Sequence, residues 1–342
     1  MAELRRFPVT VQSTYADLVS RLEADSVREA GGTPVRRQRR GRYFWYSVQR
    51  VGDRTLERYL GPDTPDVRAL VVEARRVRED ASARERARRP LVRMCREAGL
   101  PTPDVQTGKM LRTLAICGFF RLRGVLVGTH ALRCYPALLG VDIPEAHGLT
   151  EDIDIAAFHS VSVALDDKAE PPLVQAIQSI GNFSARPNLH DSPTAWRDPA
   201  SGTELEILTP NQGGEREAPL ELPAFGVHAK PLRFLDFLIH APVRAAALYR
   251  SGVLVNVPQP ARYAVHKLIV ATRRDPSAQA KVRKDTDQAA ALIRVLAEDR
   301  PDELEDAFAA AVERGRAWRK QLERGARRLP ADARAALARL DV

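Results

Sequence analysis

Two aspartates, Asp152 and Asp154, stand one residue apart in the largely apolar run GLTEDIDIAAF (148–158). Burying an unpaired carboxylate is costly, so such a pair needs a compensating cation or a solvated face. If the run is a strand, both carboxylates share one face while Ile153 and Ile155 point into the core. Two adjacent carboxylates repel each other unless a cation lies between them, and Mg²⁺ or Mn²⁺ suits such oxygen ligands. The pair therefore predicts a divalent-metal site that holds a triphosphate and activates a hydroxyl.

A third carboxylate is available on a later strand. The segment TELEILTP (203–210) alternates acidic and apolar residues, which is typical of a strand with one buried face. Glu204 and Glu206 share the other face, and Glu206 lies between two apolar residues. We therefore expect Glu206 to complete the acidic site.

A turn upstream of the aspartates supplies a complementary feature. The segment VLVGTHAL (125–132) predicts a buried strand, a Gly128-Thr129 turn and a helix that ends at Gly140. Glycine permits close backbone approach, and a helix N-terminus presents free N–H groups suited to phosphate. Thr129 adds a hydroxyl donor, so this turn is a candidate phosphate-binding element.

None of these features is specific alone, because an Asp-x-Asp pair often occurs in solvated turns. Their order, with strand, Gly-Thr turn, helix and then strand-borne acids, favours the metal site. A hydrolase site built from His130, His147 and Asp152 lacks the HxH or HExxH spacing of such sites. Cys134 has no histidine at a spacing typical of a thiol nucleophile, and the chain contains no GxSxG motif.

The elements around these motifs predict an α/β (α+β) fold. Short strands alternate with helices in the centre, and the chain after Pro260 is helical almost to its end. The charged helix that begins near Pro65 is expected to end at Pro90. We divide the chain into an N-terminal helix and β-hairpin module, a helical connector, a central α/β unit and a C-terminal helical domain, at 1–65, 66–121, 122–258 and 259–342.

The N-terminal module combines basic and aromatic residues. RRQRRGR (36–42) precedes RYFWYSVQRVGDRTLERYLGP (42–62), whose alternation around a Gly-Asp turn predicts a β-hairpin. Its aromatic run could stack on the bases of single-stranded nucleic acid. We favour the simpler interpretation that these aromatic residues pack on a neighbouring domain.

The central motifs resemble those of the DNA polymerase β-type nucleotidyltransferase superfamily. VLVGTHAL, TEDIDIA and LEILTP are similar to the series of a Gly-Thr helix, TxDxDhA and hDFLTP in an uncharacterised bacterial nucleotidyltransferase group, over about residues 122–210. The resemblance implies a mixed sheet flanked by helices. It also implies that Gly128 and Thr129 cradle phosphate and that Asp152, Asp154 and Glu206 are metal ligands. That group usually has Asp at the third position, where this chain has Glu206.

The C-terminal segments RYAVHKLIVATRR and KVRKDTDQAAALI are similar to a KL…R…KDxxD series in AbiE-type toxin nucleotidyltransferases. The resemblance implies that Lys267 and Lys284 bind the triphosphate and that Asp285 orients them. It also implies a toxin–antitoxin or defence setting, with an RNA such as a tRNA as acceptor and an antitoxin protein as partner. The alternative is an ordinary amphipathic helix pair with its charges in solvent.

The bulk composition fits this interpretation. The 342-residue chain is 44% hydrophobic and 28% charged, with a net charge of +9, which favours an anionic partner or reflects an arginine-rich proteome. It contains no predicted secretory signal or membrane helix, and its three cysteines form no CxxC pair. We therefore expect a cytoplasmic protein with no membrane partner.

The leading hypothesis is Mg²⁺-dependent transfer of a nucleoside monophosphate from an NTP to a hydroxyl, with RNA, a protein or a small molecule as acceptor. One alternative is a nucleotide-binding or nucleic-acid-binding protein that has lost catalysis because it has Glu206 at the third acidic position. In another, the N-terminal aromatic hairpin is the functional part and the central unit is its scaffold.

Overall fold

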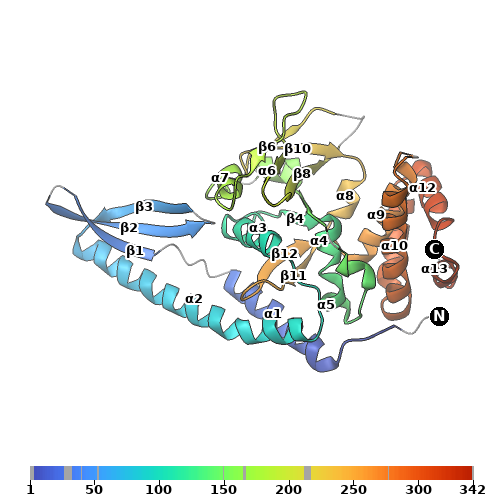
Figure 1. The fold of residues 1–342 in the computed structure, drawn as a ribbon, viewed down its shortest axis with the longest axis horizontal. Helices are drawn as coiled ribbons and strands as arrows, with labels where there is room; N and C mark the ends of the chain where they lie inside the picture. Colours follow the sequence, from blue (N-terminus) through green and yellow to red (C-terminus); the bar gives the residue numbers. More distant parts are fainter. Residues whose placement is uncertain are drawn as a thin grey trace.

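A computed structural model describes residues 4–26, 33–39, 41–51, 54–148, 150–164, 167–211, 217–275 and 277–340. A mixed sheet lies at the centre, a helical unit packs on one side of it, and a smaller sheet on a long helix projects from the other side (Figure 1). This arrangement confirms the predicted α/β fold with a mixed sheet flanked by helices.

The central sheet has the strand order β4-β5-β8-β10-β9. Its path runs through β4 (Val125–Val127), β5 (Asp152–Ala156), β8 (Glu204–Pro210), β10 (Val227–Leu232) and β9 (Leu220–Leu222). The pairs β5–β8 and β8–β10 are parallel, whereas β4–β5 and β9–β10 are antiparallel. Two short strands, β6 (Ser184–Ala185) and β7 (Ala195–Arg197), extend the sheet beside the first half of β8. Parallel pairing of β5 with β8 brings the two acid-bearing segments side by side.

Short helices and a hairpin surround this sheet. They are α3 (Val105–Ile116), α4 (Gly128–Leu132), α5 (Tyr135–Leu139), η1 (Pro144–His147), α6 (His159–Ala164), α7 (Leu173–Gln178), α8 (Leu235–Leu238) and the hairpin β11 (Val243–Ala247) with β12 (Val253–Val257). The predicted single helix from Gly128 to Gly140 is wrong, since it is divided into α4 and α5. Pro136 has no N–H to donate to the carbonyl one turn earlier, which favours the break.

The C-terminal unit contains five helices among the described residues: α9 (Pro260–Arg273), α10 (Gln279–Asp299), α11 (Pro301–Val312), α12 (Arg316–Ala326) and α13 (Ala331–Leu337). Helices α9 and α10 pack against each other beside the sheet (Figure 1). Their apolar faces join the sheet in one continuous hydrophobic core, which includes Ile153, Ile155, Leu268 and Leu292. The core thereby fixes α9 and α10 relative to the acid-bearing strands.

The N-terminal part consists of α1 (Val9–Ser26), the sheet β1 (Thr33–Arg39), β2 (Arg42–Val51) and β3 (Arg54–Pro62), and α2 (Pro65–Glu97). The three strands are antiparallel in the order β1-β2-β3. The expected end of the helix at Pro90 is wrong, because α2 continues to Glu97. Val92 and Cys95, beyond the proline, are buried against α1, and this packing offsets the roughly 3 kcal/mol that an interior proline costs.

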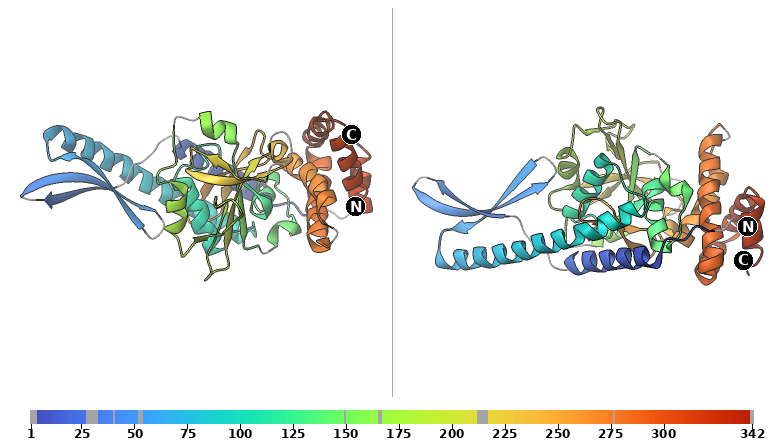
Figure 2. Two further views of the ribbon diagram at one scale, coloured as in Figure 1. Left: turned by 90° about the horizontal axis from the view of Figure 1, so that it is seen from above. Right: turned by 60° about the horizontal axis from the view of Figure 1, so that its bottom comes forward.

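Figure 2 shows that the β1–β3 sheet and the first half of α2 project from the body of the molecule. Of the aromatic run, Trp45 is buried on the face toward α2, where Arg75 lies over its ring. Tyr43 is 42% exposed and Tyr59 is 54% exposed. The expectation that the aromatic residues pack on a neighbouring domain therefore holds for Trp45 on α2 and is wrong for Tyr43 and Tyr59. No helix in the described ranges is long and apolar enough to cross a membrane.

Candidate active site

The turn at Gly128 lies directly against the second aspartate of the Asp-x-Asp pair. Strand β4 pairs with β5 so that Val127 lies opposite Asp154, and Gly128 follows with φ +65°. A Cβ atom at Gly128 would lie 2.3 Å from Oδ2 of Asp154. Glycine suits this position, because a side chain would be strained by the positive φ and would have to displace the Asp154 carboxylate. Tyr263 of α9 donates a hydrogen bond to the Gly128 carbonyl at 3.1 Å, which ties the helical unit to this turn.

The acids of β5 and β8 lie in register. Asp152 is opposite Glu204 and Asp154 is opposite Glu206, so the structure brings Asp154 and Glu206 together. Burial, followed by the charges of Glu206 and Asp152, raises the pKa of Asp154 to about 6. No described residue hydrogen-bonds to the Asp154 carboxylate. Asp154 is thus a repelled carboxylate that a cation would stabilise.

Glu206 already has a cationic partner. Lys230 of β10 donates from Nζ to Oε1 of Glu206 at 2.8 Å. Within the described ranges, no three His, Cys, Asp or Glu side chains converge as a preformed metal site. Glu206, the third expected ligand, is therefore paired with Lys230. Of the three expected metal ligands, Asp152 and Asp154 have no such cationic partner among the described residues.

The residues nevertheless fit a divalent metal by their chemistry. Hard cations prefer carboxylate oxygens, and Mg²⁺ is commonly held by one or two carboxylates together with substrate phosphates. Asp152 is exposed and shares the strand face with Asp154, so both can reach one ion. Asp152 and Asp154 would hold the cation, and Glu206 would join them once Lys230 releases it.

A cleft of about 610 Å³ opens above these acids. Gly128, Asp154 and Glu206 line it on one side. Apolar residues form much of the remaining lining, and five cationic side chains join them from β10 and the following turn and from α9 and its C-terminal end: Lys230, Arg233, Lys267, Arg273 and Arg274. Carboxylates of a type that can hold a metal therefore face cations of a type that can bind phosphate, across a space of the size typical for a small ligand.

A buried acid positions two of these cations. Asp285 of α10 is 2% exposed and accepts from Lys267 Nζ at 2.7 Å and from Arg274 Nε at 2.5 Å. Burial alone would raise the pKa of Asp285, but Lys267 and Arg274 lower it overall. Burial would likewise lower the pKa of Lys267, yet the surrounding groups, Asp285 among them, raise it. Both groups therefore remain charged, and the Lys267 ammonium is held beside the cleft.

Two of the expected phosphate ligands lie elsewhere. Thr129 is 9% exposed and is not part of the cleft lining, so the structure does not bring its hydroxyl to the site. Lys284 is exposed on α10, outside the lining. Partial desolvation of its ammonium and repulsion by Lys267 lower the pKa of Lys284, and the charges of Asp285, Asp152 and Asp154 oppose this. Lys284 thus lies near the aspartates but at the edge of the site.

Histidines contribute little charge here. His266 lines the cleft, and burial followed by the charge of Lys267 lowers its pKa to about 3. It is therefore neutral at physiological pH and cannot donate a proton as imidazolium. His130 lies outside the cleft, and burial lowers its pKa to about 4. A hydrolase site with His130 and His147 also finds no support, because His147 pairs with Asp142 instead.

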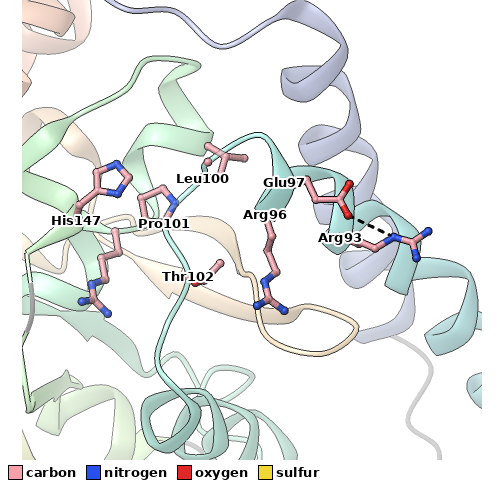
Figure 3. Close-up of a pocket in the computed structure, with 9 residues that line it drawn as sticks. Arg93, Arg96, Glu97, Leu100, Pro101, Thr102 and His147 are labelled. Carbon is pink, nitrogen blue, oxygen red and sulfur yellow. Dashed lines mark ion pairs between the residues drawn. The ribbon is translucent and has the colours of Figure 1, made fainter.

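A second hollow, of about 560 Å³, lies at the C-terminal end of α2 (Figure 3). Its lining includes Arg93, Arg96, Arg133 and His147. Arg93 pairs with Glu97 at 4.0 Å, and Arg133 donates to the Gly148 carbonyl at 2.8 Å. The acids of β5 and β8 do not line this hollow, so we assign the chemistry to the cleft above them.

Residues 105–313 match the model of a family described as nucleotidyltransferase. The chain belongs to this nucleotidyltransferase family. The match spans the central sheet together with α9, α10 and α11, so it contains the whole cleft. Residues 10–69 match a second family model, a domain of unknown function (DUF6788), which covers α1 and the β1–β3 sheet.

A comparison with curated proteins found no match. A solved structure that is similar to this nucleotidyltransferase is the crystal structure of an antigenic nucleotidyltransferase-like protein from Paracoccidioides brasiliensis. It is 18% identical with a TM-score of 0.32, and the alignment covers 65% of this chain and 94% of that one.

Sequence reasoning missed Lys230, Arg274 and Tyr263. Lys230 lies in VHAKPL, an alternating segment that gives no sign of which strand it will join. Arg274 directly follows α9 and reaches back to Asp285 in the next helix. A basic pair after a helix that carries Lys267 was the available signal, but it is equally typical of a solvated helix end.

Proposed function

We propose that this family member transfers a nucleoside monophosphate from an NTP to an acceptor hydroxyl, with the cleft above Asp154 as its active site. The observation that carries the proposal is the Asp154 carboxylate, which two other acids repel and which faces a cleft lined with cations. That arrangement suits a ligand that brings both a metal ion and several negative charges. A metal-bound nucleoside triphosphate has this chemistry.

The proposed roles follow from position. Lys267, held by Asp285, and Arg274 would bind the β- and γ-phosphates, and Lys284 would add charge at the edge. Gly128 would let the substrate approach the turn without steric conflict. Asp152 and Asp154 would hold the cation, with Glu206 as third acid. When bound, Mg²⁺ or Mn²⁺ would supply Lewis-acid stabilisation of the phosphate oxygens.

The reaction would be an in-line displacement at the α-phosphorus. The acceptor oxygen forms a bond to phosphorus, and the bond from phosphorus to the β-bridging oxygen breaks with its electron pair leaving on pyrophosphate. Glu206 would accept the proton of the attacking hydroxyl, and Lys267 and Arg274 would stabilise the charge that develops on the leaving group. Glutamate can fill this role in place of aspartate if its longer side chain moves away from Lys230.

The acceptor in this proposal is RNA, for which the net charge of +9 and the basic N-terminal sheet are the support. A tRNA as the particular RNA, a toxin role and an antitoxin partner stay predictions from the sequence. The experiment below distinguishes transfer to RNA from transfer to a protein or to a small molecule.

The test is transfer of label from α-³²P NTPs to RNA, protein or small-molecule fractions in the presence of Mg²⁺. Asp154→Asn keeps the size of the side chain and removes its charge, so we expect no transfer. Asp306→Asn, an exposed aspartate on α11, is the matched control and should transfer like the unaltered protein. Equal labelling by Asp154→Asn would contradict the assignment of the site. Mg²⁺-dependent NTP binding without any transfer would favour the non-catalytic alternative.

A further inference from the structure

The β1–β3 sheet has one face that α2 covers and one face that it does not. Trp45 is 7% exposed, and its Nε1 donates to Asp63 at 2.8 Å on the covered face. Strand neighbours alternate between faces, so Phe44 and Tyr46 point away from α2. Tyr59 lies opposite Tyr46 in β3 and shares this open face.

The three open-face aromatic residues form a contiguous cluster. The ring of Tyr59 lies 5.5 Å from that of Tyr46 in an edge-on arrangement and 6.1 Å from that of Phe44. Tyr59 is nevertheless 54% exposed, so contact within the cluster leaves much of its ring in solvent. Phe44 and Tyr46 are partly exposed beside it. Aromatic rings that are grouped and accessible on a projecting sheet are typical of a surface that binds a partner.

Arginines of β1 and β2 lie beside this cluster. Residues 33–63 contain eight arginines and three acidic residues, a net charge of +5 within a chain of +9. Arg37 lies opposite Phe44 and pairs with Glu57, so part of its charge is neutralised within the sheet. Arg42, at the start of β2, is exposed on the same face as Phe44. The partner that complements this surface is a polyanion with exposed aromatic or planar groups.

We propose that the open face of the β1–β3 sheet binds single-stranded RNA, which is the acceptor of the nucleotidyl transfer. Aromatic rings beside arginines bind unpaired bases by stacking while the cations contact the backbone. A double-stranded helix hides its base faces and cannot use the rings in this way. RNA supplies unpaired bases at its ends and loops, together with the terminal hydroxyl that the reaction requires. The inference that the protein binds RNA is drawn from the β1–β3 sheet alone. The inference that this RNA is the acceptor rests on the proposed function.

Helix α2 connects this surface to the rest of the molecule. Its 33 residues extend about 50 Å from the sheet to the hollow of Figure 3. At that end Arg93 and Arg96 lie beside Arg133, which directly follows α4, and His147, which ends η1. These last two residues belong to the segments that lead from the Gly128 turn to Asp152. An RNA strand along α2 would therefore meet cations at both ends of the helix, and its second end would lie beside the segments that connect the Gly128 turn to Asp152.

The test is binding of the full-length protein to a fluorescent single-stranded RNA of about twenty nucleotides, measured by anisotropy at fixed salt without metal or NTP. Tyr59→Ala should weaken the affinity about five- to 150-fold, as expected for loss of one stacked base. Tyr59→Phe keeps the ring and should bind like the unaltered protein. Arg42→Ala should weaken binding and reduce the salt dependence by about 0.7 in log–log slope, the value for one phosphate contact on a single strand.

Unaltered melting temperatures would show that these exposed substitutions leave the fold intact. Equal affinity of Tyr59→Ala and the unaltered protein would overturn the proposal, as would equal affinity for duplex and single strand or the absence of RNA binding. Asp154→Asn separates the two proposals, because it should bind RNA normally and transfer nothing. Transfer to RNA that survives Tyr59→Ala with unchanged KM would refute the sheet as the acceptor surface and leave the active site standing.

Discussion

Gly128 and Asp154 lie so close that a Cβ atom on Gly128 would come within 2.3 Å of the Asp154 Oδ2 atom. The contact joins the turn after β4 to the acid-bearing strand β5. It explains in steric terms why a glycine stands at this position, and it makes the position a sensitive test of the site.

We predict that Gly128→Ala abolishes nucleotidyl transfer and lowers the free energy of unfolding by about 1–3 kcal/mol. The alanine must adopt a positive φ and must also displace the Asp154 carboxylate. Gly226→Ala is the matched control, since Gly226 has a similar φ of +63° but no atom within 4 Å of its added Cβ. Chemical denaturation and transfer assays of both variants would separate backbone strain from the clash. Full activity of Gly128→Ala would show that catalysis does not depend on the close approach of the Gly128 backbone to Asp154.

The second prediction concerns the pH dependence of stability. The folded-state pKa of Asp154 is about 6, above its ordinary value of 3.8, so the native state binds the proton more tightly than the unfolded state. The ionised carboxylate therefore destabilises the fold, and stability is lost as the pH rises from about 4 through about 6. At pH 8 the penalty is up to about 3 kcal/mol, since each pKa unit corresponds to about 1.4 kcal/mol.

Asp154→Asn should consequently be inactive yet more stable than the unaltered protein at pH 8 in the absence of metal. The difference should vanish below about pH 4, where Asp154 is protonated in both states. Thermal melts across this pH range measure it, with Asp306→Asn as an exposed control that should show no such difference. If Asp154→Asn melts at or below the temperature of the unaltered protein at pH 8, the prediction that the ionised Asp154 carboxylate destabilises the fold is refuted.

Part of this site could be predicted from the sequence and part could not. The Asp-x-Asp spacing and the apolar neighbours of Glu206 indicate strand faces, because a strand has a local period of two. The contact between Gly128 and Asp154 depends on the register of β4 with β5, which are joined by a long segment that includes α4, α5 and η1. The pairing of Lys230 with Glu206 depends on β10 joining β8 in parallel, which no local pattern encodes. Phosphate binding at Thr129 was expected from a longer helix than the one that forms.

The same division applies to the fold. Alternation around a Gly-Asp turn predicted the hairpin of β2 and β3, and this hairpin is present. Helix α2 passes through Pro90 because Val92 and Cys95 pack on α1, and this tertiary contact outweighs the local preference. The projection of the β1–β3 sheet likewise depends on the continuity of α2 and has no local signature.

The third prediction tests the buried acid that holds Lys267. Asp285→Asn should lower the free energy of unfolding by about 2–4 kcal/mol, because it removes a charge that two cations contact in a mostly buried setting. It should also raise the KM for NTP more than it lowers kcat if Lys267 binds phosphate in the ground state. Since the pKa of Asp285 is lowered, this stabilisation is present at neutral pH and is lost as the pH falls below 3.8.

Asp287→Asn on the same helix is the control for Asp285→Asn. Its pairing with Arg283 at 3.7 Å is solvent-exposed, so we expect a change below about 0.5 kcal/mol and normal kinetics. Similar losses in both variants would mean that the effect arises from α10 in general. It would then not come from the Asp285 contacts with Lys267 and Arg274.

The last prediction concerns the competition between Lys230 and a metal for Glu206. The ion pair of 2.8 Å holds the Glu206 carboxylate, and its lysine is half exposed and free to move on binding. Lys230→Ala should therefore increase the affinity for Mn²⁺ several-fold, as measured by calorimetry or by the loss of the free-ion electron paramagnetic resonance signal. The KM for NTP should rise at the same time, because Lys230 lines the cleft and would contact phosphate once released. Lys320→Ala, an exposed lysine on α12, should change neither quantity. Unchanged Mn²⁺ affinity in Lys230→Ala would mean that Glu206 is not a metal ligand, and it would leave Asp152 and Asp154 as the acids that bind the cation.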